Sequence, residues 1–381
     1  MTQAKLSLRD VRVRRGRSEL VNVPQLDVLE GEVLVIIGPN GAGKSVLLET
    51  LALLQGPTAG HVLFEGQPVR GRQLGLRRRM AVVFQESAML RRSLADNVAM
   101  GLRLRGVPRS VRRERVQRWM ERFGIDHLAH RSALTVSGGE AQRANLARAF
   151  AVEPEVLLLD EPFSALDQPT RDDLLEDLSA ALRETGVTTV FVTHDRTEAL
   201  RLGDRLAVMM GGAIRQMGTA VEVFAAPVDE EVAAFVGVEN IVAGRVRSLA
   251  DGLATLELGG ATVESAGRPP VWAVASSPEV GSEVLVCLRP EDVVIEPGGR
   301  DSHRTSARNH LHGSITRITP LGGQVRVVVD CGFPLVALIT KQSLEDLGLK
   351  VGDEAVASFK ASGVHLIPRG RTKNPDTASA V

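Results

Sequence analysis

The chain has 381 residues, and its 46 basic residues (Lys and Arg) balance 46 acidic residues (Asp and Glu), so its formal net charge is zero. At about 100–200 residues per domain, this length predicts two or three domains. A neutral chain with two Trp and no Tyr lacks the basic excess and the stacking surface typical of nucleic-acid binders. We therefore expect no nucleic-acid partner.

The sequence shows no sign of a membrane span or a secretion signal. No apolar run approaches the ~18 residues of a spanning helix, and residues 1–10 hold no apolar core of signal-peptide length. Cys287 and Cys331 are too few for a disulfide framework and lie in apolar runs, which predicts buried free thiols in a reducing compartment. We expect a chain that acts at a membrane only through partners.

The first 237 residues alternate between strand and helix patterns. Residues 5–35 alternate apolar and polar side chains, as antiparallel strands do, and the apolar run Val33–Ile37 predicts a strand covered on both faces. A helical pattern follows at Ser45–Leu54, and Ser110 is the expected cap of a later helix. Two more apolar runs predict buried strands: Val156–Leu159 and Thr188–Val192. This alternation predicts an α/β domain with a largely parallel sheet.

Beyond about residue 238 the helical pattern gives way to short β runs between Gly, Pro and Asp turns. Residues 240–246 match 309–315, and residues 281–289 match 352–360 at nearly the same offset. This internal repeat predicts two small β-barrels of the OB-like kind. We assign the domains as follows: an α/β domain at 1–238, a first barrel at 239–300, a second barrel at 305–368 and a disordered tail at 369–381.

A glycine-rich loop follows the first buried strand. Its sequence fits the phosphate-loop pattern G-x-x-x-x-G-K-[ST] over eight residues: Gly38, Pro39, Asn40, Gly41, Ala42, Gly43, Lys44 and Ser45. Glycines let backbone N–H groups turn toward phosphate oxygens, and the following helix N-terminus adds partial positive charge. We expect Lys44 to reach the β- and γ-phosphates and the Ser45 hydroxyl to bind Mg²⁺.

A pair of carboxylates ends the second buried strand. Asp160 is placed to hold Mg²⁺, directly or through water. Glu161 comes next, where a carboxylate can orient and deprotonate the attacking water. The motif predicts nucleotide hydrolysis in addition to binding.

A second anion-binding helix start is encoded at Ser137-Gly138-Gly139, before a helix that runs through Arg148. One triphosphate does not need two such ends within one chain. Two chains arranged head to tail would use both, so the sequence predicts a dimer.

Six motifs follow one another in the order of a known family. Besides the phosphate loop and the carboxylate pair, they are Gln85, Ser137-Gly138-Gly139-Glu140, Ser164-Ala165-Leu166-Asp167 and His194. Over residues 5–237 the chain resembles the nucleotide-binding subunit of ATP-binding cassette (ABC) transporters. The implied fold is an α/β P-loop NTPase, with a RecA-like core, an antiparallel β subdomain and a helical subdomain, followed by the all-β C-terminal region.

The resemblance also implies roles for single residues. Gln85 contacts the metal and faces the permease, while Asp167 belongs to the D-loop, the turn 164–167 at the ATP site. His194 is the switch histidine and joins Glu161 as a catalytic residue. The signature residues bind ATP held by the partner subunit: Ser137, Gly138 and Gly139.

For the whole protein, the resemblance implies an ATPase that couples ATP and Mg²⁺ to solute import. Its partners are a second ATPase subunit, integral-membrane permease subunits and, indirectly, an extracytoplasmic solute-binding protein. The implied location is peripheral, on the cytoplasmic face of the cell membrane.

Two positions depart from the family's pattern. Val136 and Glu140 replace the ends of the usual Leu-Ser-Gly-Gly-Gln signature, and we expect the Glu140 charge to point away from the nucleotide. The family's adenine-stacking aromatic corresponds to Arg15, next to Gly16. A guanidinium plane can stack on a base with less area, so modest adenine selectivity is expected. The alternative is that Arg15 is a solvated strand residue.

The second C-terminal repeat resembles the small molybdate-binding (TOBE-type) barrel of oxyanion-transport ATPases. Its matching residues include four that suit a tetrahedral dianion: Ser306, Arg308, Lys360 and Ser362. The first repeat has Arg289-Pro290-Glu291 instead, where a carboxylate replaces the donors. The cargo implied is molybdate or tungstate. It remains open whether the barrels bind the anion for regulation or only brace the dimer.

Other functions remain as alternatives. Importers of ferric iron, sulfate, polyamines and sugars also carry C-terminal barrels of this kind. A cassette ATPase that acts on DNA or ribosomes is a different class, and such proteins usually have two cassettes or a long coiled coil. The single cassette without heptads between phosphate loop and signature favours the importer.

Overall fold

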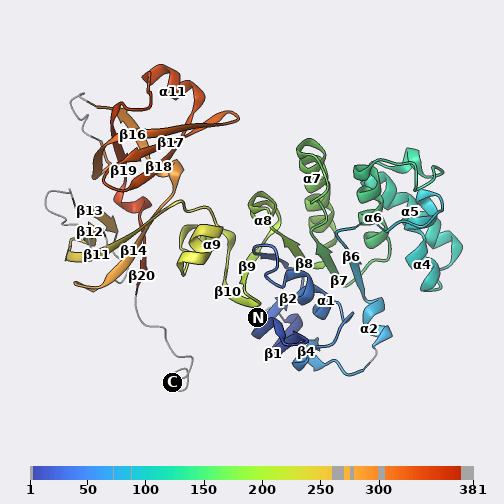
Figure 1. The fold of residues 1–381 in the computed structure, drawn as a ribbon. Helices are drawn as coiled ribbons and strands as arrows, with labels where there is room; N and C mark the ends of the chain where they lie inside the picture. The colour runs from blue at the N-terminus through green and yellow to red at the C-terminus, as the bar shows by residue number, and fades with distance from the viewer. Residues whose placement is uncertain are drawn as a thin grey trace. The chain divides into compact units, whose positions relative to one another are not determined.

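The computed structural model describes residues 3–71, 73–86, 88–259, 270–274, 279–298 and 305–369. The chain divides into two compact units, 1–223 and 224–381, and Figure 1 labels most of their elements. Of the expected tail 369–381, all but Arg369 lies outside the described residues. Within the described ranges, no helix has the length and apolar character to span a bilayer.

Two sheets form the first unit. The antiparallel sheet has the order β2-β1-β4-β5, with β1 (Ala4–Arg15), β2 (Ser18–Leu29), β4 (Ala59–Phe64) and β5 (Gln67–Pro68). The mixed sheet has the order β10-β9-β3-β8-β7-β6, with β3 (Val33–Ile37), β6 (Met80–Val83), β7 (Val156–Asp160), β8 (Thr188–Thr193), β9 (Arg205–Met210) and β10 (Ala213–Gly218). All its neighbouring strands are parallel except β9 and β10. The expected α/β fold with a largely parallel sheet is confirmed.

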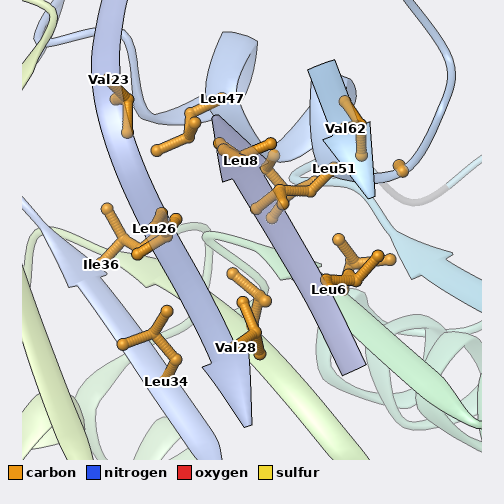
Figure 2. Close-up of a cluster of buried hydrophobic side chains, with 14 of the residues drawn as sticks. Leu6, Leu8, Val23, Leu26, Val28, Leu34, Ile36, Leu47, Leu51 and Val62 are labelled. Carbon is orange, nitrogen blue, oxygen red and sulfur yellow. The ribbon is translucent and has the colours of Figure 1, made fainter. Parts of the chain in front are cut away.

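The continuous apolar runs of the sequence become the centre of this sheet. Every residue of β3, β7 and β8 is buried, as expected for strands that are covered on both faces. Helix α1 (Lys44–Leu51) buries Leu47 and Leu51 in the same core cluster as the inner faces of β1, β2 and β3. Figure 2 shows these side chains meeting between the two sheets. This packing fixes the start of α1, and with it the glycine loop.

The remaining helices of this unit pack beside its sheets or form a helical group between β6 and β7. They are α2 (Leu74–Arg78), α3 (Leu94–Val98), α4 (Met100–Leu104), α5 (Arg109–Arg122), α6 (Gly138–Ala151), α7 (Gln168–Thr185) and α8 (Arg196–Leu202). Helices α9 (Ala220–Ala225) and α10 (Glu230–Phe235) follow β10 along the chain. In the helical group, Trp119 of α5 packs on Phe150 of α6 with ring centroids 4.7 Å apart. The expectation that Ser110 caps α5 is wrong: Pro108, with its fixed φ, is the N-cap, and Ser110 lies in the first turn.

Two five-stranded antiparallel sheets form the second unit. One has the order β13-β12-β11-β14-β20, with β11 (Asn240–Ala250), β12 (Leu253–Leu258), β13 (Val271–Val274), β14 (Glu283–Leu288) and β20 (His365–Pro368). The other has the order β15-β19-β16-β17-β18, with β15 (Val294–Pro297), β16 (Asn309–Leu321), β17 (Gln324–Asp330), β18 (Pro334–Thr340) and β19 (Glu354–Phe359). Helix α11 (Lys341–Leu347) follows β18.

The two sequence repeats exchange their last strands. Strand β20 of the second repeat pairs with β14 of the first, and β15 of the first repeat pairs with β19 of the second. The ranges 239–300 and 305–368 therefore describe the repeats along the chain, whereas each sheet takes one strand from the other repeat. One hydrophobic cluster joins both sheets.

Matching asparagines connect the two sheets at the start of each repeat. The Asn240 amide donates to Val336 O at 2.9 Å and accepts from Val336 N at 2.6 Å. The Asn309 amide donates to Trp272 O at 3.0 Å and accepts from Trp272 N at 2.7 Å. Each buried side chain thus acts as one more strand residue along an edge strand of the other sheet.

Candidate active site

The functional residues gather at one edge of the parallel sheet, because parallel strands end on the same side. Strand β3 leads into the glycine loop, β6 is followed by Gln85, β7 ends at Asp160 and β8 is followed by His194. A cavity of about 520 Å³ opens there. Eight residues predicted from the sequence line it: Asn40, Gly41, Gly43, Lys44, Ser45, Gln85, Glu161 and His194.

The loop can only be built from glycine at two positions. A Cβ on Gly38 would lie 2.1 Å from Met209 O of β9. Gly43 has φ of 96° and a Cβ there would lie 2.4 Å from Leu20 O of β2. Strands β9 and β2 therefore lie too close to the loop backbone for a side chain at either position.

Lys44 is buried and held over the loop. Its Nζ donates to Gly38 O at 2.9 Å and to Pro39 O at 3.2 Å, and it lies 3.3 Å from Glu161 Oε1. A buried ammonium needs such partners, because leaving it without them would be strongly unfavourable. This arrangement holds the charge at the rim where phosphates would lie.

Ser45 and Asp160 form an oxygen pair at the start of α1. Ser45 Oγ donates to Asp160 Oδ1 at 3.1 Å. Burial raises the pKa of Asp160, and the Ser45 hydrogen bond opposes that shift. Hydroxyl and carboxylate oxygens are the donors that Mg²⁺ prefers, so the pair fits this ion. Among the described residues, no group of three or more His, Cys, Asp and Glu is placed to hold a metal ion.

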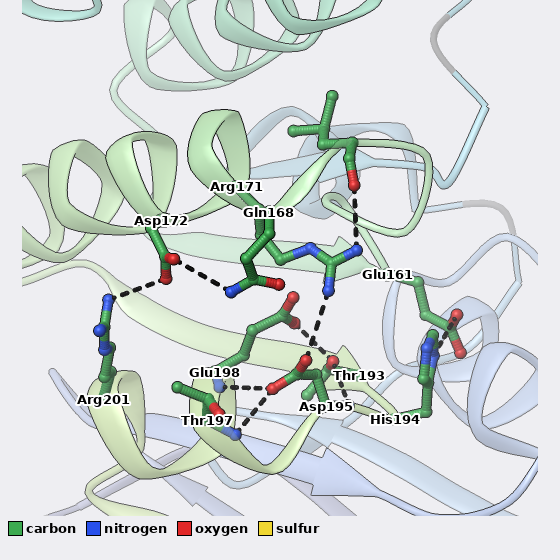
Figure 3. Close-up of polar contacts among 11 residues, drawn as sticks. Glu161, Gln168, Arg171, Asp172, Thr193, His194, Asp195, Thr197, Glu198 and Arg201 are labelled. Carbon is green, nitrogen blue, oxygen red and sulfur yellow. Dashed lines mark hydrogen bonds and ion pairs between the residues drawn. The ribbon is translucent and has the colours of Figure 1, made fainter. Parts of the chain in front are cut away.

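Glu161 and His194 lie side by side at the cavity. Glu161 Oε2 is 2.9 Å from His194 Nδ1, and both side chains face the cavity (Figure 3). The backbone of Glu161 has φ of 42°, a left-handed conformation that is uncommon for a residue other than glycine. Strain of this kind persists where the surrounding structure enforces it, here through the Glu161 N–H bond to Val192 O at 2.9 Å.

The signature residues form a separate feature of this chain. Ser137 is the N-cap of α6 and accepts a hydrogen bond from Glu140 N, while the Glu140 carboxylate accepts from Ser137 N at 2.7 Å. That backbone bond lowers the pKa of Glu140. A Cβ on Gly139 would lie 2.8 Å from Thr170 Cγ2 of α7. None of Ser137, Gly138 and Gly139 is among the residues that line the cavity.

Two other predicted contacts also lie outside the lining residues. Asp167 is the N-cap of α7, where its side chain accepts from Thr170 N. Arg15 is exposed and ends β1, opposite Ser18 in the β1–β2 hairpin. Leu20 of β2 lines the cavity instead, and the sequence gives no signal for it, because an ordinary apolar strand residue looks the same in any sheet.

The four predicted oxyanion residues are exposed around the start of β16 and the end of β19: Ser306, Arg308, Lys360 and Ser362. Asn309 pairs with Phe359, so Arg308 and Lys360 flank that pair on neighbouring strands. Among the described residues, neither side chain makes a hydrogen bond or an ion pair. At the equivalent place in the first repeat, Asn240 pairs with Leu288, and the flanking residues are Glu239 and Arg289, which carry opposite charges.

Comparison with known proteins identifies both parts of the chain. The ABC transporter family matches residues 21–164, and the TOBE domain matches residues 305–366. The molybdate/tungstate import ATP-binding protein WtpC of Pyrococcus horikoshii is 40% identical over 90% of this chain and 94% of its own length. This chain belongs to the ABC transporter family. The chain is therefore an ATP-hydrolysing, ATP-binding subunit of this family.

Two further proteins with lower similarity support this assignment. The sulfate/thiosulfate import ATP-binding protein CysA of Caulobacter vibrioides is 36% identical over 83% of this ABC protein and 89% of its own length. A solved dimeric structure of an ATP-binding cassette, MJ0796, bound to ADP and Pi covers 56% of this chain and 98% of its own, with 28% identity and a TM-score of 0.51. The expected cassette fold followed by an all-β region with a TOBE domain is confirmed.

Proposed function

We propose that this chain is the ATPase subunit that energises import of molybdate or tungstate through a separate permease. The observation that carries the cargo assignment is the match to the molybdate/tungstate relative, which extends over 90% of the chain and so includes the C-terminal repeats. The sulfate/thiosulfate relative is less similar over less of the chain. The alternative cargoes are sulfate, ferric iron, polyamines and sugars, and a transport assay that shows import of one of them would replace this assignment.

The working form is a dimer of two copies arranged head to tail around two ATP molecules. Two observations support it: Ser137 is exposed at a helix N-terminus outside the phosphate-loop cavity, and a cassette of similar fold is dimeric with ADP and Pi. In that dimer, Ser137 and Gly139 of one copy face Lys44 of the other. The subunit is peripheral on the cytoplasmic face of the membrane, with Gln85 toward the permease and a solute-binding protein acting on the far side.

The residues of the cavity divide the work of hydrolysis. Ser45, Asp160 and Gln85 would hold Mg²⁺, which would supply charge neutralisation at the β- and γ-phosphates. Lys44 adds a fixed positive charge there. Glu161 accepts a proton from the attacking water, and His194 orients the Glu161 carboxylate and contacts the γ-phosphate. Because both carboxylate oxygens of Glu161 have cationic or hydrogen-bonding neighbours, the carboxylate is held in one orientation.

Substitution of Glu161 tests this division directly. Glu161→Gln keeps the size and hydrogen bonding of the side chain but removes its basicity. We expect ATP binding to remain and turnover to fall by about 10²–10⁴. Glu176→Gln, an exposed glutamate on α7, is the matched control and leaves turnover unchanged. Wild-type turnover in Glu161→Gln would show that another group activates the water.

The second repeat has a charge arrangement that suits an oxyanion. Arg308 and Lys360 flank one strand pair without a partner among the described residues, and like charges at neighbouring strand positions repel each other. A bound dianion relieves that repulsion, with Ser306 and Ser362 as hydroxyl donors. In the first repeat, Glu239 and Arg289 stand at the equivalent positions, so the same site does not form there.

Calorimetry of the full chain with molybdate, tungstate and sulfate tests this site. We expect molybdate and tungstate to bind at least tenfold more tightly than sulfate, and Arg308→Ala with Lys360→Ala to abolish binding. Arg317→Ala, an exposed arginine farther along β16, is the control. Equal binding of all three anions, or binding that survives the double substitution, would overturn the anion site, while ATP turnover would still report the ATPase.

A further inference from the structure

Arg171 of α7 joins two segments that flank the catalytic pair. Its Nη2 donates to Leu166 O at 3.0 Å, and Leu166 belongs to the D-loop, the turn 164–167 that follows Glu161. Its Nη1 donates to Asp195 Oδ2 at 3.4 Å, and Asp195 directly follows His194 (Figure 3). One guanidinium therefore spans from the D-loop to the residue beside the switch histidine.

Asp195 makes hydrogen bonds to residues on both sides of His194, through its carboxylate and its N–H. Its Oδ1 accepts from Thr197 N at 2.7 Å and from Glu198 N at 3.1 Å, which caps α8. Its own N–H donates to Thr193 Oγ1 at 2.9 Å. The other oxygen of this carboxylate, Oδ2, accepts the hydrogen bond from Arg171. A displacement of Asp195 therefore moves His194, which lies 2.9 Å from Glu161.

The Arg171 guanidinium makes these two contacts through its Nη1 and Nη2 atoms, and its third nitrogen, Nε, makes none within the described part of the chain. Arg171 Nε is buried and has no hydrogen-bond partner among the described residues. A buried donor without a partner is unfavourable, so this orientation is retained because of what Nη1 and Nη2 hold. Only arginine offers two such donors on a rigid planar fork, whereas lysine presents one compact charge.

We infer that Arg171 is a positioning residue for ATP hydrolysis, which couples the D-loop to His194. Because the guanidinium binds both the Leu166 carbonyl of the D-loop and Asp195, a displacement of the D-loop also displaces Asp195. The position of His194 relative to Glu161 then changes as well. Arg171 touches neither the nucleotide cavity nor its lining residues Lys44 and Ser45, so it acts on turnover and leaves binding intact. This role requires only the ATPase activity and is independent of the cargo.

A second ion pair between the same two helices provides a matched control. Arg201 of α8 lies 3.3 Å from Asp172 of α7, and both side chains are largely solvated. This pair links α7 to α8 without contacting the D-loop or Asp195. Arg201→Ala therefore removes one bridge between these helices but leaves the proposed coupling in place.

The test measures kcat and KM for ATP, together with thermal midpoints, on the full chain. Arg171→Ala is expected to lower kcat at least tenfold with KM changed less than threefold, and Arg171→Lys to fall between it and wild type. Arg201→Ala is expected to keep kcat within twofold. A purely structural role for Arg171 would lower the thermal midpoint with kcat per folded molecule unchanged, and that result would overturn the proposal.

A double-substitution cycle keeps the proposal testable if Arg171→Ala folds poorly. Asp195→Asn retains an oxygen that caps α8 but removes the charge that faces Arg171. We expect Arg171→Lys and Asp195→Asn each to lower kcat, and the double variant to lose no more than the larger single effect. Independent, multiplicative losses would show that the two residues do not act as one unit and would contradict the coupling.

Discussion

At the scale of single residues, Glu161 brings together backbone strain and a fixed electrostatic environment. Its left-handed φ places the carboxylate between Lys44 and His194, with 3.3 Å and 2.9 Å to their nitrogens. The sequence predicted all three as residues of the ATP site from motif position, but not their contacts with one another. It also could not predict the strain, because φ depends on how β7 and β8 hold the turn. Leu20 was not predicted for a similar reason: its place at the cavity depends on how β2 packs in the folded unit.

The adenine position is the residue-level prediction in which this chain departs from its family. Arg15 offers less stacking area than an aromatic ring, and it lies outside the residues that line the cavity. We expect kcat/KM for ATP to exceed that for GTP by less than about tenfold, which is about 1.4 kcal/mol of discrimination. Steady-state turnover with each nucleotide measures the ratio. A preference of a hundredfold or more would place a strong adenine contact elsewhere.

Glu198 carries a second residue-level prediction, which concerns stability. Burial raises the pKa of Glu198 to about 7, with Asp195 adding to the shift and Thr193, Arg171 and His194 opposing it. Because the folded pKa lies above the ordinary value of 4.5, the protonated form stabilises the fold at low pH. That contribution is lost as pH rises from about 4.5 to 7, and amounts to about 3 kcal/mol.

The matched substitution isolates this one group. Glu198→Gln keeps a neutral side chain beside Thr193 at every pH. The free energy of unfolding of this variant, minus that of wild type, should therefore be about 2–3 kcal/mol larger at pH 8 than at pH 5, measured by urea unfolding. Glu176→Gln, exposed on α7, should show no such trend. A stability difference that stays constant between the two pH values would contradict the buried, protonated carboxyl.

At the scale of elements, the sequence predicted well those strands and loops whose residues form a recognisable local pattern. The apolar runs became β3, β7 and β8 with nearly the expected bounds, because strands buried on both faces contain few polar residues. The exchange of β15 and β20 between the repeats could not be predicted. A sequence repeat shows only that two segments are alike. Because β14 and β19 are similar strands, either of them could pair with β15 or β20.

The symmetric asparagines yield a prediction about these elements. In Asn309→Ala, Trp272 loses partners for both its N–H and its C=O at an edge strand. We expect the second unit to lose about 2–3 kcal/mol of unfolding free energy. Urea unfolding in a Trp119→Phe background measures it, with Trp272 as the fluorescence reporter. His312→Ala, exposed on the same strand, should change little, and equal losses in both variants would contradict the role of the asparagine.

At the scale of the whole molecule, the two anion-binding helix ends belong to one reaction only if two chains meet. One chain supplies Lys44, Ser45 and Glu161 to its cavity, while Ser137 caps α6 outside the lining residues. The sequence predicted this division from the surplus of anion-binding ends. Where the two units of the chain stand in the working complex is a property of the assembly, which no pattern within one chain encodes.

Light scattering of Glu161→Gln with Mg²⁺ and ATP is the most direct test of this account. ATP should convert the 40.9 kDa chain into a particle of twice that mass with one nucleotide per chain. Without nucleotide it should remain monomeric, and Ser137→Arg, which places bulk and charge at the α6 N-terminus, should prevent the doubling. A variant that binds ATP yet remains monomeric would contradict the shared site, as would a dimer that Ser137→Arg does not disturb.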